Sequence, residues 1–236
     1  MTVPDAAGDT ALAAVRRCKM ASTQRLLGDT ITISAADWTQ PTILPGWTRA
    51  HLATHLARNA DALRQAVQRV VAGEPFQLDP DDDLRELEAG SRRSPLDLQI
   101  DLDTTAGQLT ETFSALSQEQ WRLPAGDRLT IADLPLARLN EVVLHHIDLD
   151  CGFSFVDLDP RLARWLLAWN VRRRSDLAAG PRITIQSSSG YQAVVGAYGG
   201  SVPVSGSDAN LLGWITGRLS PSAVSGADGL DVGPAR

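Results

Sequence analysis

The sequence predicts an α+β protein, with an antiparallel four-helix bundle followed by a small α/β domain. Through about the first 150 residues, apolar side chains recur at helical spacing in four segments. Beyond them the pattern changes to short β-branched runs separated by Gly and Ser, which are typical of strands. We therefore predict two domains, residues 1–155 for the bundle and 156–236 for the α/β part.

The first half of the bundle is expected from two helices. Apolar positions predict a helix over residues 10–27, with Gly28 as a natural stop. Residues 29–47 hold two prolines and a glycine, so we expect a loop with a short turn. A second helix is predicted over 48–72, because Thr48 is a good N-cap and an apolar stripe follows it.

The second half of the bundle begins after a connection. Residues 73–93 are charged and contain proline, and we interpret them as a link between helices. A third helix starts at Ser94 or Pro95, since Pro is allowed in the first turn, and ends near Leu116. The fourth spans 133–149, with an aspartate as its predicted cap.

The α/β domain is expected to start with a helix near residues 160–178. Its strands are predicted within "RITIQSSS", "YQAVVGAY" and "SVPVSGS". Ser207 or Asp208 can cap a last helix over 209–218. Residues 220–236 are rich in Gly and Ser and predict a mobile tail.

Composition narrows the class of protein. The chain has 236 residues and a net charge of -6, which argues against nucleic acid as a partner because phosphate binding needs a basic face. Its densest basic run, Arg172 to Arg174, is expected to be a solvated helix face. No apolar run approaches the roughly 20 residues of a membrane span, and the first residues lack a secretion-signal pattern. Two cysteines, Cys18 and Cys151, fit a reducing compartment, so we expect a cytoplasmic protein.

All four histidines lie in two short apolar stretches. "GWTRAHLATHLARN" contains His51 and His55, and "LNEVVLHHIDLD" contains Glu141, His145 and His146. Helix positions four apart share a face, so the first two histidines are neighbours, and so are the glutamate and the histidine four places later. Imidazoles and a carboxylate facing inward from different helices are how bundles hold metal ions, and zinc accepts both kinds of ligand.

Spacing alone leaves the third ligand open between His51 and His55. His146 points about 100° away from His145, so we expect it outside the site. Asp148 continues the face of His145 and could accept the second ring N–H of a ligand histidine. The alternative for this aspartate is an ion pair with an arginine of a neighbouring helix.

The motifs "GWTRAHLATHLARNADAL" and "NEVVLHHIDLD" resemble the two signatures of the mycothiol-dependent maleylpyruvate isomerases, which belong to the DinB-like metal-binding bundles. The resemblance covers about residues 10–219 and implies a four-helix bundle followed by a small α/β domain. The resemblance implies that the metal ligands are His51, Glu141 and His145. It implies a packing or supporting role for His55. Zinc is the expected metal, although this ligand set also accepts other divalent ions.

Arg218, in "SDANLLGWITGR", resembles the arginine that reaches the active site of these isomerases from their last helix. The resemblance implies contact with the substrate or the thiol, in a cleft between the bundle and the small domain. The alternative is that Arg218 complements the C-terminal end of the helix dipole. The resemblance gives no cofactor-binding residue beyond these, so the mycothiol site is not assigned.

The activity implied by the resemblance is cis–trans isomerisation of maleylpyruvate to fumarylpyruvate, a step in aromatic catabolism. A thiolate of mycothiol, ionised by the metal, would add to the double bond, allow rotation and be eliminated. A mycothiol S-transferase acting on an electrophile is the first alternative, and a non-catalytic metal-binding bundle is the second. The expected partners are thus a small-molecule substrate and a low-molecular-weight thiol, and neither Cys18 nor Cys151 is expected to be the nucleophile.

Overall fold

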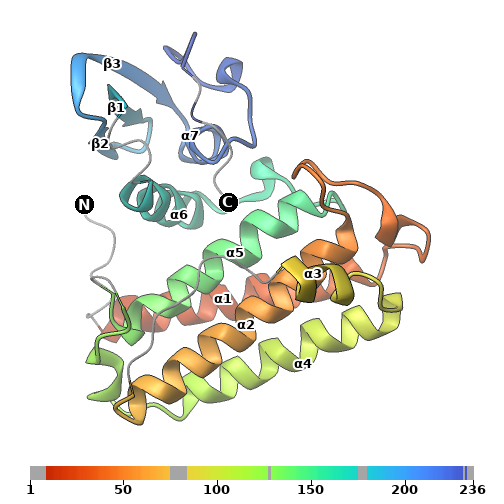
Figure 1. Cartoon of the computed structure of the whole chain (residues 1–236). Helices are drawn as coiled ribbons and strands as arrows, with labels where there is room; N and C mark the ends of the chain where they lie inside the picture. Colours follow the sequence, from red (N-terminus) through yellow and green to blue (C-terminus); the bar gives the residue numbers. More distant parts are fainter. Residues whose placement is uncertain (1–8, 75–83, 127–128, 175–179, 231, 233–236) are drawn as a thin grey trace. The chain divides into compact units, whose positions relative to one another are not determined.

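The computed structural model describes residues 9–74, 84–126, 129–174, 180–230 and 232. In this part of the chain it contains seven α-helices and one three-stranded sheet, which confirms the predicted α+β class (Figure 1). The chain divides into two compact units, with the division between residues 153 and 154. None of the described helices is long and apolar enough to cross a membrane.

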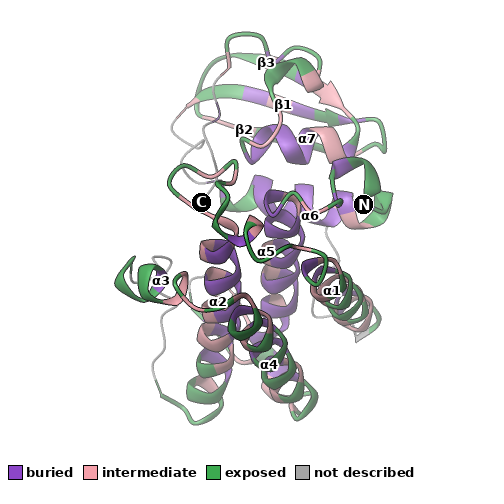
Figure 2. Cartoon of the chain, turned by 90° about the vertical axis from the view of Figure 1, so that its right-hand side faces the viewer, coloured by how far each residue is buried: buried purple, intermediate pink, exposed green. Residues whose placement is uncertain are grey.

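The first unit is built on four long helices that pack side by side (Figure 1). They are α1 (Asp9–Thr30), α2 (Arg49–Val71), α4 (Pro95–Ser114) and α5 (Leu134–Asp148). Helix α2 packs against both α4 and α5, and α1 packs against α5 and α4. Their buried faces form the core, and Figure 2 shows buried residues running along α5. Large side chains such as Leu56, Leu98 and Leu139 are almost fully buried there.

Helix α1 extends beyond the predicted stop at Gly28 and ends at Thr30. A glycine in a helix costs only about 1 kcal/mol relative to alanine, so it does not by itself end the helix. The extra turn is closed by the Thr30 hydroxyl, which donates to the Leu27 carbonyl at 2.8 Å. Helix α2 begins after the predicted cap, Thr48, whose side chain accepts from the backbone N–H of His51.

The predicted connection over 73–93 contains a helix that the sequence pattern missed, α3 (Leu84–Gly90). Residues 75–83 lie outside the described part. Helix α3 buries a single large side chain, Leu87, and packs on α2. Its two leucines, Leu84 and Leu87, form too short an apolar pattern to predict a helix, which is why the prediction failed.

Asp133 precedes α5 as predicted, but its side chain does not cap that helix. Its carboxylate accepts instead from the backbone N–H and the hydroxyl of Thr130, at 2.8 and 2.9 Å, within a preceding 3₁₀ turn. Helix α4 begins as predicted, with Ser94 as its cap and Pro95 in its first turn.

The second unit contains α6 (Pro160–Arg173), β1 (Pro181–Ser187), β2 (Gln192–Val195), β3 (Tyr198–Gly206) and α7 (Asp208–Ile215). The strand order is β2-β1-β3, with β1 antiparallel to β2 and parallel to β3. Helix α7, capped by Ser207, packs against α6 and contacts β1 and β3.

The segment after α7 was predicted to be mobile, but its described residues belong to the fold. Ser225 exchanges two backbone hydrogen bonds with Ser205 of β3, at 2.9 and 2.8 Å. Ala227 is buried as well. Backbone pairing with a strand end needs no particular side chain, so the Gly- and Ser-rich composition did not reveal it. Residue 231 and residues 233–236 lie outside the described part.

Candidate metal centre

Three potential metal ligands meet where α2 and α5 pack together. One ligand atom from each of His55, Glu141 and His145 can be chosen so that all lie within 4.8 Å of one another. The Nε2 atoms of His55 and His145 lie 3.2 and 3.3 Å from the same carboxylate oxygen, Oε2 of Glu141. The two imidazole rings meet edge to face, with centroids 4.7 Å apart.

The local structure explains how these side chains converge. Glu141 and His145 lie one turn apart on α5, as their spacing predicts, and His55 faces them from the second turn of α2. Trp47, just before α2, has its ring centroid 5.2 Å from that of His55 and 6.4 Å from that of His145. The tryptophan thus restricts the orientation of both imidazole rings.

Asp148 makes the contact expected for a residue that supports a ligand histidine. Its Oδ2 lies 2.9 Å from Nδ1 of His145, and its side chain is fully buried. A buried carboxylate at this position keeps a proton on Nδ1. The Nε2 atom of His145 is then the nitrogen that faces Glu141.

Glu141 is held as a carboxylate. Burial by itself raises its pKa, but hydrogen bonds from His145 and His55 and their positive charge outweigh burial and hold the pKa well below the usual range. Arg138, one turn earlier on α5, is almost fully buried and donates to the Leu56 carbonyl. Burial lowers the pKa of Arg138 to about 10, and the charge of Glu141 opposes that change.

The structure does not bring His51, the ligand that the resemblance implied, into this group. Its Nδ1 accepts from the backbone N–H of Thr48 at 3.1 Å, so that Thr48 and His51 form a reciprocal capping box at the start of α2. A neutral imidazole that accepts at Nδ1 carries its proton on Nε2, and this atom lies 3.5 Å from Glu88 of α3. His55, one turn further along the same face, occupies the place expected for His51.

A sequence signal for this difference existed. Thr48 followed three residues later by a side chain that can accept a hydrogen bond is the pattern of a capping box, with His51 in the position that Glu or Gln usually takes. A histidine engaged in a cap is less available as a ligand. Spacing alone leaves both histidines as candidates for the third metal ligand, and the resemblance favours His51.

His146 lies outside the metal group, as expected from its angle on α5. It is 1% exposed, stacks on Phe153 with a centroid distance of 4.4 Å, and places Nε2 3.0 Å from Asp29 of α1. Burial lowers its pKa to about 4. Burial likewise raises the pKa of Cys151 to about 11, which makes this thiol a poor nucleophile.

Arg218 lies in the second unit, just after α7 and the left-handed Gly217. It is partly buried, and its guanidinium donates to the Thr216 carbonyl at 3.3 Å. The metal group belongs to the first unit. Contact between Arg218 and a bound substrate therefore stays a prediction.

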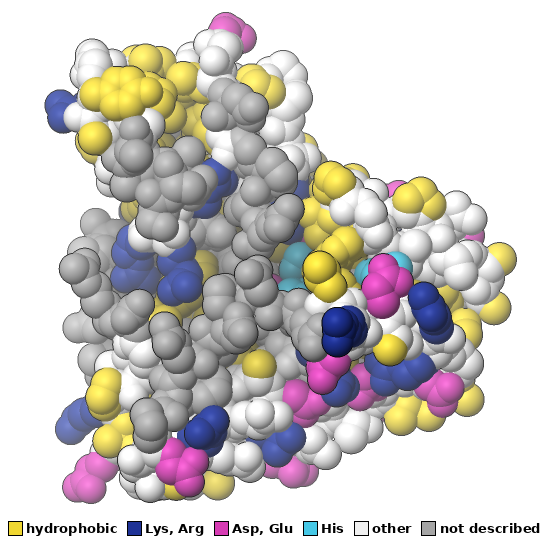
Figure 3. Space-filling view, viewed as in Figure 1, with side chains coloured by type: hydrophobic (Ala, Val, Ile, Leu, Met, Phe, Trp, Pro, Cys, Tyr) yellow, Lys and Arg dark blue, Asp and Glu magenta, His cyan; other side chains and the backbone are white. Residues whose placement is uncertain are grey.

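The donor set of His55, Glu141 and His145 fits a divalent metal ion. Two imidazole nitrogens and one carboxylate oxygen form the three-ligand set of catalytic zinc sites, which leave a further position open. His145 lies between the carboxylates of Asp148 and Glu141, so its Nε2 must present either a proton or a cation to Glu141. A divalent cation satisfies both imidazoles and the carboxylate at once. The side chains of His55 and His145 are 16% and 9% exposed, so both are only partly shielded from solvent. Figure 3 shows histidine side chains at the surface of the molecule.

Comparison with known proteins places the chain in a family. Residues 20–150, more than half of the 236, match the family described as "Mycothiol maleylpyruvate isomerase N-terminal domain". Two solved structures are similar: the mycothiol-dependent maleylpyruvate isomerase and a mutant of it with one histidine replaced by alanine. They are 23% and 22% identical to this chain, each with a TM-score of 0.83 over 95% of this chain and 96% of the other. No match was found among curated protein sequences. The chain thus belongs to the mycothiol maleylpyruvate isomerase N-terminal domain family.

Proposed function

We propose that this protein is a metal-dependent cis–trans isomerase that uses mycothiol to convert maleylpyruvate to fumarylpyruvate. The single observation that carries the proposal is the group of His55, Glu141 and His145, found in a chain of this family. The group has the ligand types of a catalytic zinc site and is partly open to solvent.

The proposed ligands are His55, Glu141 and His145, with His55 in place of His51. Bound there, a divalent metal, zinc in this proposal, would supply the Lewis acid that ionises a thiol near neutral pH. Asp148 holds the ligand face of His145 toward Glu141, and Trp47 restricts both imidazole rings.

The substrate would be bound by other residues of the chain. Maleylpyruvate is a dianion, and a guanidinium can form two parallel hydrogen bonds with a carboxylate. We assign this role to Arg218, which follows α7. The cytoplasm, where low-molecular-weight thiols are kept reduced, is the proposed location.

The test is the conversion of maleylpyruvate by zinc-loaded protein, with and without mycothiol, followed by proton NMR of the product. We expect fumarylpyruvate only when mycothiol is present. The His55→Ala variant should be inactive, whereas His146→Ala should keep activity because His146 contacts Asp29 and Phe153 and lies outside the metal group.

Two results would contradict the proposal in different ways. Conversion at the same rate without mycothiol would exclude the thiol from the reaction. Consumption of mycothiol by an electrophile, with no isomerised product, would identify an S-transferase that uses the same metal group.

A further inference from the structure

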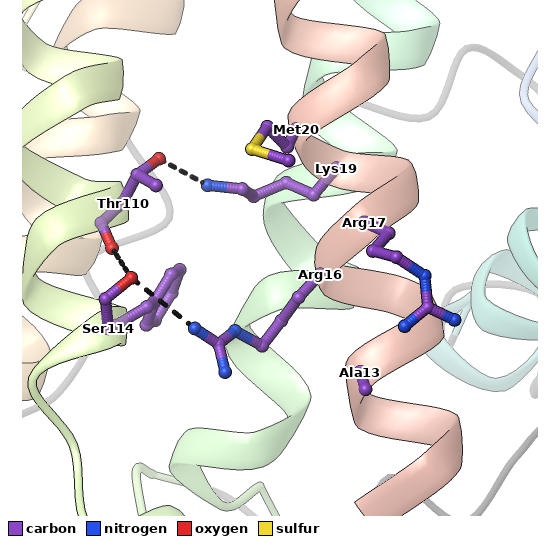
Figure 4. Close-up of a pocket in the computed structure, with 8 residues that line it drawn as sticks. Ala13, Arg16, Arg17, Lys19, Met20, Thr110 and Ser114 are labelled. Atoms are coloured by element: carbon purple, nitrogen blue, oxygen red, sulfur yellow. Dashed lines mark hydrogen bonds between the residues drawn. The ribbon is translucent and has the colours of Figure 1, made fainter.

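A pocket lies between α1 and α4, within the first unit and with no residue in common with the metal group (Figure 4). Its volume is about 270 Å³, which is enough for a small organic molecule. The lining residues are Ala13, Arg16, Arg17, Lys19, Met20, Thr110, Phe113 and Ser114. Nothing in the proposed isomerase reaction uses this pocket.

Two cations reach across the pocket from α1 toward hydroxyl groups of α4. The Nζ atom of Lys19 donates to the Thr110 hydroxyl at 2.7 Å, and Arg16 donates to the Ser114 hydroxyl at 3.5 Å. Figure 4 shows both side chains directed toward α4, whereas Arg17 points away from it. Lys19 is the only lysine of the chain and is 4% exposed.

In the part of the chain that the structure describes, Arg16 and Lys19 lack the carboxylate partners that several arginines have. Within the described residues, no ion pair joins Arg16 or Lys19 to a carboxylate, and their other contacts are the rings of Trp121 and Phe113. Arg58, by contrast, pairs with Asp101 at 2.8 Å. A buried charge without a counter-charge is costly, and hydroxyl groups and aromatic rings do not neutralise it.

Other charged groups near Lys19 add to the excess of positive charge at the pocket. Burial, which has the largest effect, and the charges of Arg138 on α5 and Arg16 on α1 together lower the pKa of Lys19 to about 8. On α4 the ammonium group contacts the Thr110 hydroxyl and the Phe113 ring, neither of which carries a negative charge. The pocket is thus a positively charged site in a chain whose net charge is -6.

We propose that this pocket binds a small organic carboxylate, with Lys19 and Arg16 holding its anionic group and the apolar wall holding its body. Ala13, Met20 and Phe113 supply that wall. Two of the three ammonium protons of Lys19 remain for a ligand after the bond to Thr110, and Arg16 can contribute further donors. An apolar wall beside the cations favours a carboxylate on a hydrocarbon body over a small inorganic anion.

The single lysine makes the test direct. Full-length protein labelled with ¹³C-lysine should give one Cε resonance, whose change with pH reports the ionisation of Lys19. Added benzoate should raise the pKa of Lys19, because a bound anion favours the ammonium form. The affinity for benzoate should accordingly fall as pH rises above 8, by up to about tenfold per pH unit. Equal concentrations of sodium chloride and of inorganic phosphate are the comparison arms.

Matched variants separate a bound ligand from a general effect of charge. Arg16→Gln should abolish the effect of benzoate. Arg25→Gln removes the same charge from the same helix, at a residue that pairs with Asp29 and does not line the pocket, and should leave the effect intact. Lys19→Met should bind no benzoate in calorimetry. If this variant does not fold, Arg16→Gln, in which a partly exposed residue is changed, still decides the question.

Three results would overturn the proposal. An unchanged pKa of Lys19 in every anion would show that Arg16 and Lys19 only link α1 to α4. An equal effect of phosphate and benzoate would show that the apolar wall plays no part in recognition. Retention of the benzoate effect in Arg16→Gln, with its loss in Arg25→Gln, would place the anion outside this pocket.

Discussion

The two histidines of α2 differ in how their ring nitrogens are used. His51 uses Nδ1 to accept from the backbone of Thr48, while His55 directs Nε2 toward Glu141 at 3.2 Å. Identical side chains one turn apart are thereby assigned to a helix cap and to the proposed metal centre. Sequence spacing placed both on one face but could not distinguish them, because the distinction depends on what lies opposite each ring.

This distinction makes a first prediction about metal content. The His55→Ala variant should lose most of its bound metal after dialysis, because one of three ligands is removed. His51→Ala should keep its metal and instead lose about 1 kcal/mol of stability, the usual effect of a lost cap. Elemental analysis and urea unfolding measure the two quantities. Full metal content in His55→Ala together with loss in His51→Ala would return the ligand role to His51.

Asp148 should increase the affinity of the centre for metal although it is not a ligand itself. Replacing it by Asn keeps an acceptor for Nδ1 of His145 but removes the negative charge, so metal affinity should fall about 10- to 100-fold. Competition with a chromogenic chelator measures the affinity. A matched variant is Asp133→Asn, since Asp133 also accepts local hydrogen bonds near α5 but lies at its other end, and it should leave metal affinity unchanged.

The buried lysine predicts how stability depends on pH. The pKa of Lys19 is lowered from 10.5 to about 8 in the folded protein, so between these values the unfolded chain binds more protons. Stability should therefore rise as pH increases from about 8 to about 10, by on the order of 2 kcal/mol. Urea unfolding of the wild type and of Lys19→Met measures this, and the variant should lack that contribution to the rise. Parallel pH dependence in both proteins would contradict the lowered pKa.

At the scale of elements, helices with an apolar stripe and a cap were predicted well. Thr48 and Ser94 begin α2 and α4 as expected, because caps and periodic apolar residues are local in sequence. Helix α3 was missed since its formation depends on packing of Leu87 against the bundle. The extension of α1 past Gly28 depends on the hydroxyl of Thr30, a contact that composition does not reveal.

The packing of α3 on α2 gives a prediction of its own. A Cβ atom at Gly90 would lie 2.3 Å from Cγ2 of Thr54, which is almost fully buried. Gly90→Ala should therefore destabilise the protein by about 1–3 kcal/mol, the usual range for overpacking. Combining it with Thr54→Ser, which removes that methyl group, should recover most of the loss. Denaturant unfolding of both single variants and the double variant gives the coupling, and simple additivity would contradict the contact.

At the scale of the whole molecule, the proposed metal ligands and the proposed substrate-binding arginine lie in different units of the chain. All three proposed ligands, together with Asp148 and Trp47, belong to the unit that ends at residue 153. Arg218 belongs to the unit that begins at residue 154. The sequence predicted candidate site residues in each unit. Periodicity and motifs are local in sequence, however, and do not show how distant segments pack against each other. Metal content and turnover should therefore respond differently to changes in the second unit.

Arg218→Ala tests this separation. If the guanidinium holds a substrate carboxylate, its loss should lower kcat/KM for maleylpyruvate about 10- to 100-fold, the effect of losing a charged hydrogen bond. Metal content should stay that of the wild type, since the ligands lie in the other unit. Arg182→Ala is the control, because Arg182 is an exposed arginine of β1 and should leave both quantities unchanged. Loss of metal in Arg218→Ala would show a structural role, and unchanged kcat/KM would remove Arg218 from the reaction.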